Sequence, residues 1–312
     1  MRRNELIERR LTFHQLRIFK SVVDHQSFTR AADALNLSQP GVTHQIQALS
    51  ETVGHPLFQP GHGRLALTAV GSALYARSRQ ILGLVTQTEA EIDDIAGLRG
   101  GSVRLAAEGT AGSYLLPDAL ATFQRAHRDV HLNLQIRGPR GIWELLHWGE
   151  VDLGVAGEPP PSGELKADRL CDEQLLCFSA PDHPLAARQP LTPADLAAGP
   201  LLTLDREAES TYVAEAQRLR GRAAPATMEL PSAEAMKRVV ASGHGVGVLS
   251  RPALGPELLE GTVRVLEVEG FPLARPWYLV WHRDRLQSPA IQAFVDLLRA
   301  SRWGSGAEVL AG

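Results

Sequence analysis

The chain has 312 residues, of which 44% are hydrophobic and 21% are charged, and this composition is typical of a soluble globular protein with two or three domains. No apolar run approaches the roughly 18 residues of a membrane span, and the basic start MRRNELIERR has no apolar stretch behind it. The sequence therefore predicts neither a membrane protein nor a secreted one. Two cysteines, Cys171 and Cys177, are too few for a disulfide framework, so we expect reduced packing residues in a cytoplasmic protein.

Charge is distributed unevenly along the chain. Residues 1–66 hold eight basic and five acidic side chains, a net charge of +3, whereas the remaining residues carry a net charge of −6. A mildly basic N-terminal unit beside an acidic body favours a local contact between that unit and a polyanion.

Three short helices are predicted before residue 55. Apolar spacing predicts a helix over residues 11–23, and Ser27 is the expected N-cap of a second helix, Phe28–Leu35. Ser38 is the expected N-cap of a third helix, which ends at Gly54. The third helix is expected to bury one narrow stripe, formed by Val42, Ile46, Leu49 and Val53. Two helices joined by a short turn in this way predict a helix-turn-helix, although any small helical bundle can show the same pattern.

The outer face of the third helix has an unusual composition. Thr43, His44 and Gln47 stand where lysine and glutamate usually face solvent, and such uncharged polar side chains suit contact with base edges. Two short apolar runs then flank residues 60–63, which predicts a hairpin or wing with Arg64 near its tip. A winged helix-turn-helix would place that arginine beside the DNA backbone or in the minor groove.

From Thr68 the sequence is helical for about thirty residues, with apolar residues at the spacing of a coiled-coil seam. The residues predicted to pair two subunits are Leu74, Ile81, Val85 and Ile92. An amphipathic helix that packs on its own chain is the alternative, since Ser78 and Thr88 interrupt the seam. The glycine-rich residues 97–101 then mark a domain boundary.

Beyond Gly101 the pattern changes to alternating strands and helices. Strands are predicted in SVRLAAE, HLNLQIRG and VDLGVAG, and helices in 114–125 and 143–148. A second set comprises strands LLCFSA, PLLTLD, ATMELP, GVGVLS and VRVLEVE, with helices near 211–220 and 233–242. The chain closes with strand PWYLVWHR and helix 290–299. This order predicts an α/β architecture in two halves, with a ligand bound beyond the carboxyl ends of the strands.

Together these segments resemble a LysR-type transcriptional regulator, from about Leu11 to about Arg302. The most specific part is FTRAADALNLSQPGVTHQIQALSETVGHPLFQPGHGRLALTAVG, and MELPSAEAMKRVVASGHGVGVLS fits the second lobe of the family's binding domain. The tail GFPLARPWYLVWHRDRLQSPAIQAFVDLL is similar to the branch that includes regulators of carbon fixation and sulfur assimilation.

The resemblance implies a specific domain organisation. Residues 1–67 would form an all-α winged helix-turn-helix that binds DNA, and residues 68–98 a linker helix for dimerisation. Residues 101–312 would form a periplasmic-binding-protein-like effector domain with two α/β lobes, one from about 101–165 plus 272–303 and the other from about 166–271.

The resemblance also implies partners and DNA contacts. Expected partners are double-stranded promoter DNA, a second copy of the chain in a dimer or tetramer, and RNA polymerase as a further candidate, without any cofactor or metal. The DNA contacts would be Thr29, Arg30, Ser38, Gln39, Pro40, Thr43, His44, Gln47 and Arg64. Glutamine can pair with adenine N6 and N7, and a threonine methyl can touch the thymine methyl.

This sequence departs from the family pattern at His44, where arginine is more common. The recognition helix therefore contains no lysine or arginine. Phosphate affinity is then expected from Arg30, Arg64, the arginines at positions 2, 3, 9 and 10, and the doubling of contacts in a dimer.

The implied effector is a small polar molecule that carries a carboxylate or phosphate group. Its expected contacts are Glu108, Thr110, Ser113, Arg140, Arg206, Ser210, Thr211 and Ser232. Glu108 stands where the family often has a hydroxyl, and its carboxylate would repel an anion unless an arginine such as Arg140 or Arg206 faces it. Ser210, Thr211 and Ser232 can equally be helix N-caps without any ligand.

Two other classes of protein share the predicted α/β body. An enzyme is disfavoured because the sequence has no G-x-S-x-G elbow, no phosphate-binding G-x-x-x-x-G-K and no H-E-x-x-H. A solute-binding protein of transport would need an export signal and would have no use for residues 11–66.

Overall fold

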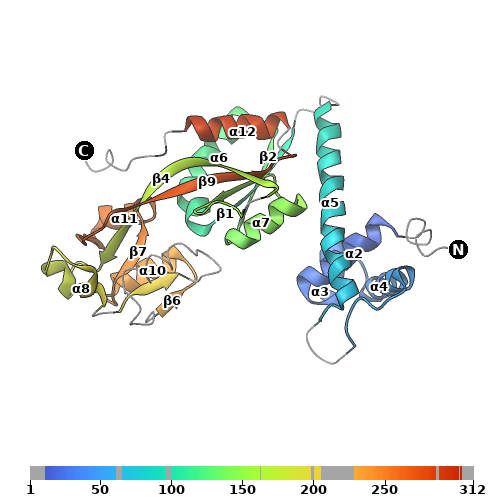
Figure 1. The fold of residues 1–312 in the computed structure, drawn as a ribbon, viewed down its shortest axis with the longest axis horizontal. Coiled ribbons are helices and arrows are strands. Elements are labelled where there is room, and N and C mark those ends of the chain that lie inside the picture. The colour runs from blue at the N-terminus through green and yellow to red at the C-terminus, as the bar shows by residue number, and fades with distance from the viewer. Residues whose placement is uncertain are drawn as a thin grey trace. The chain divides into compact units, whose positions relative to one another are not determined.

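The computed structural model describes residues 11–60, 65–95, 100–161, 163–197, 200–204, 228–285, 288–301 and 303. The chain divides into two compact units, one formed by Met1–Glu91 with Trp148–Glu150 and the other by Ile92–His147 with Val151–Gly312. Figure 1 shows the helical first unit in blue to cyan and the α/β second unit in green to red. Within the described ranges, no helix is both long and apolar enough to span a membrane.

The described part of the first unit opens with three helices whose ends lie close to those that the sequence predicts. They are α2 (Phe13–His25), α3 (Phe28–Leu35) and α4 (Gln39–Val53). Both predicted N-caps are confirmed, because the Ser27 hydroxyl accepts from the Arg30 N–H and the Ser38 hydroxyl accepts from the Gly41 N–H. Gly54 closes α4 with φ of 76°, a left-handed conformation that glycine adopts without steric cost.

The predicted stripe of α4 lies in the core of the first unit. Val42, Ile46, Leu49 and Val53 are all buried there. They pack in one cluster with Phe19 and with the small Ala31 and Ala32 of α3, which let the helices approach closely. The ring of Phe19 meets that of Phe58 edge to face at 5.7 Å, so the start of the hairpin is anchored to the same core.

The predicted hairpin is present at its base. Phe58 pairs with Leu67 in an antiparallel bridge, and the Gln59 N–H donates to the Ala66 carbonyl at 2.8 Å. The tip of the wing, residues 61–64 with Arg64, lies outside the described residues. The long helix α5 (Ala69–Ile95) follows, and the Thr68 hydroxyl caps it by accepting from the Gly71 N–H.

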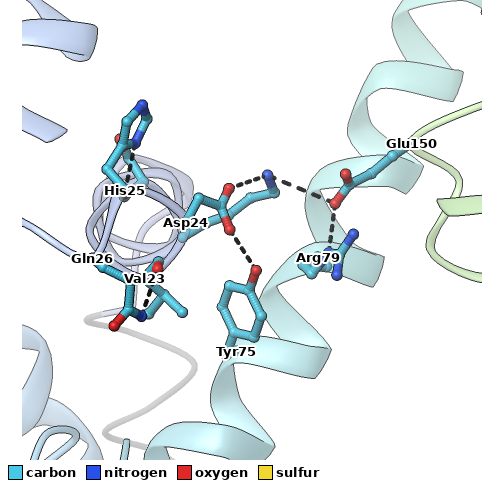
Figure 2. A network of polar contacts seen from close by, with 9 residues as sticks. Val23, Asp24, His25, Gln26, Tyr75, Arg79 and Glu150 are labelled. Atoms are coloured by element: carbon cyan, nitrogen blue, oxygen red, sulfur yellow. Dashed lines mark hydrogen bonds and ion pairs between the residues drawn. The ribbon is translucent and has the colours of Figure 1, made fainter. Parts of the chain in front are cut away.

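A polar network joins α2 to α5 (Figure 2). The Tyr75 hydroxyl donates to Asp24, whose other oxygen lies 2.7 Å from Lys20 Nζ. Lys20 and Arg79 both contact the Glu150 carboxylate, at 3.7 and 2.7 Å. Burial and the hydrogen bond to Asp24 raise the pKa of Tyr75, so its hydroxyl remains a donor. The network fixes the last turn of α2 against the second turn of α5.

The second unit is built on a seven-stranded sheet in the order β2-β1-β3-β9-β4-β7, with β8 also paired to β4. The strands are β1 (Ser102–Ala107), β2 (His131–Ile136), β3 (Leu153–Ala156), β4 (Leu165–Ser179), β7 (Gly247–Ser250), β8 (Arg264–Leu266) and β9 (Leu273–His282). β1, β2 and β3 are parallel to one another, so their carboxyl ends share one edge. A separate parallel pair consists of β5 (Leu202–Leu204) and β6 (Met228–Leu230).

Helices cover the sheet in two places that have separate hydrophobic cores. α6 (Pro117–Ala126) and α12 (Pro289–Ala300) lie on one face of β1 and β9, and α7 (Pro139–Trp148) lies on the other (Figure 1). These two faces have separate apolar clusters and together form one lobe. The other lobe has one cluster, which contains α10 (Ala233–Ala241), α11 (Arg251–Glu260) and the short α8 (Pro193–Ala197). The long strands β4 and β9 join the lobes, which gives the predicted two-lobed architecture.

Several sequence predictions for this unit need correction. β4 begins at Leu165 rather than Leu175, and β9 begins at Leu273 rather than Pro276. The helix predicted over 114–125 is instead a π-helical turn, Ala111–Leu115, followed by α6. The helix predicted near 211–220 lies outside the described residues. α11 was not predicted, because its sequence RPALGPELLE contains two prolines and a glycine.

Candidate DNA-binding surface and effector site

Every described residue predicted to contact DNA is exposed. Ser38, Gln39, Pro40, Thr43, His44 and Gln47 are exposed along α4, and Thr29 and Arg30 are exposed at the start of α3. The exposed side chains of α4 lie opposite the buried stripe, because residues four apart share a helix face. The first unit therefore presents an uncharged polar helix face that its own core does not use.

Gln39 and Thr43 are linked on this face. The Thr43 hydroxyl donates to the Gln39 carbonyl at 3.1 Å and accepts from Gln39 Nε2 at 3.0 Å. This arrangement orients the Gln39 amide and leaves its Oε1 and its second N–H without a hydrogen bond to any described residue. One acceptor and one donor on the same amide are what bidentate pairing to adenine requires.

The cationic groups near this face lie outside α4. Arg30 is exposed in the first turn of α3, next to the Ser27 cap. Arg64 and the arginines at 2, 3, 9 and 10 lie outside the described residues, so their phosphate contacts stay predictions. In protein–DNA complexes, arginines that bind phosphates supply affinity, whereas uncharged side chains that contact base edges supply sequence choice.

The candidate effector site lies at the carboxyl edge of β1, β2 and β3. Glu108 follows β1, Arg140 lies in the first turn of α7 after β2, and Gly157 follows β3. Thr110 is buried and Ser113 is exposed in the turn after β1. Ligands of parallel α/β sheets bind beyond this edge.

Glu108 is the centre of a buried charged cluster at that edge. Its side chain is 0% exposed, and its Oε1 accepts from the Gly157 N–H at 2.7 Å. Arg275 of β9 lies opposite Glu173 of β4, and the two form an ion pair at 2.7 Å. The guanidinium also stacks on the ring of Trp277, 4.0 Å from its centroid. Burial raises the pKa of Glu108 to about 7, although Arg275 and the Gly157 N–H act in the opposite direction.

A second polar cluster joins the turn after β1 to the start of α10. The Tyr114 hydroxyl donates to Glu234 Oε1 at 2.5 Å. The buried Lys237 pairs with Glu234 at 2.6 Å and with Glu257 of α11 at 2.7 Å. Burial and the bond to Glu234 raise the pKa of Tyr114 to about 12. The two lobes are therefore linked by hydrogen bonds beside the predicted site.

The structure thus brings together only part of the predicted effector set. Ser232 caps α10 by accepting from the Ala235 N–H, as the alternative interpretation expected, and Arg140 is exposed. Arg206, Ser210 and Thr211 lie outside the described residues. The arginine that faces Glu108 is Arg275, which sequence reasoning missed.

Other residues were missed for a simple reason. Glu173 and Arg275 lie just outside the predicted strands 175–180 and 276–283, so their cross-strand pairing was not visible. Gly157 and Tyr114 were also not singled out. A prediction that extended both strands through their polar ends would have placed Glu173 opposite Arg275.

A separate pocket of about 490 Å³ opens beside β4 and β8. Its polar lining combines one cation, Arg251, with the acids Glu267 and Glu269, and the remainder is largely apolar. None of the predicted effector residues in the described ranges lines it. The carboxyl edge of β1 to β3 is therefore the better candidate for an anionic ligand, because the fold places Arg140 and Arg275 there.

Comparison with known families decides the identity of the chain. Residues 13–72 match the family described as "Bacterial regulatory helix-turn-helix protein, lysR family", and residues 96–303 match the LysR substrate binding domain. The chain belongs to the LysR family of bacterial transcriptional regulators. It is a DNA-binding regulator with a two-lobed effector-binding domain, as the resemblance implied. Its relatives are regulators rather than enzymes.

The LysR-type chain is similar to a RuBisCO operon transcriptional regulator of Allochromatium vinosum, with 34% identity over 92% of this chain and 95% of the relative. This similarity agrees with the predicted carbon-fixation branch. Among solved structures, full-length CbnR complexed with its target DNA has a TM-score of 0.68 at 22% identity, covering 93% of this chain and 99% of that one. The regulatory domain of Synechocystis PCC6803 CcmR in complex with 2-PG has a TM-score of 0.58 at 27% identity, covering 64% and 96%.

Proposed function

We propose that this LysR-type regulator binds promoter DNA as a homo-oligomer, with the exposed face of α4 in the major groove. The observation that carries the proposal is the position of Gln39, Thr43 and Gln47 opposite a fully packed apolar stripe. No side chain of the first unit's core needs these polar groups, whereas base edges do. The chain acts as a regulator in the cytoplasm, without catalysis of its own.

The residues have distinct roles in this proposal. Gln39 reads adenine through its free Oε1 and N–H, and the methyl of Thr43 contacts a thymine methyl. His44, Gln47, Ser38, Pro40 and Thr29 complete the contact surface. Arg30 and Arg64 supply phosphate affinity, which does not depend on sequence. Since α4 has no lysine or arginine, each subunit binds weakly and two half-sites are needed.

The proposal extends to target genes and partners. The similarity to a RuBisCO operon regulator supports control of a carbon-fixation operon. We propose RNA polymerase as a further partner at the promoter. The effector is a small anion of the 2-PG type, since the related CcmR domain carries 2-PG. It binds at the carboxyl edge of β1 to β3, near Glu108, Thr110 and Arg140.

The DNA-binding part is tested by quantitative footprinting on the promoter next to the regulator's own gene. Gln39→Ala and Thr43→Ala should each weaken binding to the proper site by about 1–3 kcal/mol and relax base choice at one position. Arg30→Ala should weaken binding to all sequences alike and reduce the salt dependence.

Ser50→Ala is the matched control within the same helix. Its hydroxyl donates to the Ile46 carbonyl at 2.9 Å and belongs to the inner side of α4, so its removal should leave base choice intact. Unchanged footprints for both Gln39→Ala and Thr43→Ala would show that another surface reads the bases.

A further inference from the structure

Glu108 is a buried carboxyl group with only one of its two oxygens engaged. Oε1 accepts from the Gly157 N–H at 2.7 Å. Oε2 is buried and has no hydrogen-bond partner among the residues that the structure describes. A buried polar atom without a partner costs free energy unless a ligand completes it. This oxygen lies at the edge where the proposed effector binds.

Among the described residues, the charges around Glu108 do not balance if it is ionised. Arg275 of β9 is the cation that acts on it, and Arg275 already forms an ion pair with Glu173 of β4. The nearby Glu158, after β3, adds a further negative charge. Two buried carboxylates would then share one guanidinium. Burial of an uncompensated charge is resolved in proteins by protonation of the acid.

Gly157 ties Glu108 to this cation. Its N–H holds Oε1, while a Cβ at position 157 would lie only 2.9 Å from Arg275 Cζ. The guanidinium therefore packs directly beneath the residue that binds Glu108. On the opposite side, the turn that begins at Glu108 carries Tyr114, which is bonded to Glu234 of α10 and is itself a neutral hydroxyl. Within the described residues, Glu108 therefore has no cation of its own, since Arg275 is shared with Glu173.

From this geometry we infer that Glu108 is a neutral acid in the ligand-free protein and donates a hydrogen bond from Oε2 to an anionic oxygen of the effector. The inference rests on the proposed function, since it assumes that an anion binds at this edge. Protonation explains how a glutamate can lie in a site that binds an anion. The protonated carboxyl group donates a hydrogen bond to the ligand, whereas the carboxylate would repel it. Protonation of Glu108 thereby removes the charge that would repel an anionic ligand from this edge.

If the inference is correct, Glu108 carries its proton whenever the effector is bound. Above the pKa of Glu108 the acid ionises, so an anion can bind only if a proton is taken up with it. A single linked proton weakens affinity up to tenfold for each pH unit. Glu108→Gln keeps a neutral donor of the same shape and keeps an oxygen for the Gly157 N–H, so this variant should bind the anion without that dependence.

The test uses the full chain and 2-PG as the probe, with inorganic phosphate as a second anion. Affinity is measured by titration calorimetry at about pH 6.5 and about pH 8.5, in two buffers of different ionisation enthalpy, to count protons. The wild type should lose about tenfold or more in affinity relative to Glu108→Gln across this interval. Titration of the phosphate group itself affects both proteins equally, so the difference isolates Glu108. Infrared difference spectra between the two ligand-free proteins should contain the carbonyl band of a protonated carboxyl group.

The outcomes separate the inference from the proposed function. Parallel pH profiles in wild type and Glu108→Gln, with binding retained, overturn the inference and leave the effector proposal intact. Absence of the protonated carboxyl band near neutral pH also overturns it. If neither anion binds either protein at millimolar concentration, the anionic-effector proposal is wrong and the inference fails with it. Glu108→Ala, which removes the donor and the charge alike, should bind the anion more weakly than Glu108→Gln at both pH values; equal affinity of these two variants would show that no hydrogen bond is donated from position 108 and would overturn the inference.

Discussion

Glu108 makes the stability of the second unit depend on pH. Its pKa is raised from 4.5 to about 7 in the folded chain, so the folded state binds the proton more tightly than the unfolded state. The contribution to stability is complete below about pH 4.5 and is lost as pH rises through about 7. The upper bound on this loss is about 3 kcal/mol. Urea unfolding of wild type and Glu108→Gln at several pH values should show that only the wild type loses this increment. Parallel stability curves would contradict the raised pKa.

Gly157 is predicted to tolerate no side chain. A Cβ there would lie 2.9 Å from Arg275 Cζ and 3.0 Å from Nη1. The guanidinium cannot withdraw easily, because Glu173 and Trp277 hold it. Gly157→Ala should therefore lower the free energy of unfolding by about 1–3 kcal/mol. Gly141→Ala in α7 is the matched control, since the nearest described atom to a Cβ there is Arg137 Cβ at 3.3 Å and alanine favours a helix. Equal effects of the two substitutions in urea unfolding would refute this.

Single residues also show where sequence reasoning succeeds. The exposure of Thr43, His44 and Gln47 followed from the period of α4, because one buried stripe fixes the opposite face. Arg275 could not be predicted as the partner of Glu108 in the same way. Its position depends on strand pairing between residues about a hundred apart in sequence, and no local pattern encodes that pairing.

At the scale of elements, a hydrogen bond between Tyr75 and Asp24 contributes to the contact of α2 with α5. Tyr75 donates to Asp24, and its ring also meets Phe19 edge to face at 6.5 Å. Tyr75→Phe keeps the ring and removes the hydroxyl, so it should cost about 1–2 kcal/mol of the first unit's stability. Asp24→Asn should cost a similar amount. The double variant should lose less than the sum of the two, as measured by a double-mutant cycle in urea. Strict additivity would show that the contact contributes nothing.

The helices of the first unit were predictable, whereas the long strands of the second were not. Ser27 and Ser38 each begin a helix with a side-chain cap, and these local signals set the boundaries. The first half of β4, LKADRLCDEQ, carries charged residues on its exposed positions and has no apolar run. It is a strand because β9 pairs with it along its length, apart from an irregularity after Arg169. Tertiary pairing thus outweighs local propensity.

At the scale of the whole molecule, α5 carries apolar side chains without a described partner surface in the same chain. Ile81, Leu84 and Ile92 are 37%, 62% and 58% exposed, and Val85 is partly exposed. Leu74 differs from them, since it packs against the core of the first unit, as the alternative interpretation of the helix expected. The proposed pairing surface therefore begins after Ser78 and consists of Ile81, Leu84, Val85 and Ile92. Leu84 is not among the residues that the coiled-coil spacing predicted.

The proposed function couples DNA affinity to self-association through that surface. Because α4 has no lysine or arginine, we expect a single subunit to make few phosphate contacts and to need its twin for tight binding. Ile81→Asp should dissociate the oligomer in sedimentation velocity and roughly halve the slope of log affinity against log salt. Thr86→Asp is the matched control, since Thr86 is exposed on the same helix but lies about 140° away from Ile81 around its axis. Dissociation by Thr86→Asp, or an intact oligomer with Ile81→Asp, would place the pairing surface elsewhere. The slope of log DNA affinity against log salt then shows whether two subunits still contact the DNA at the same time.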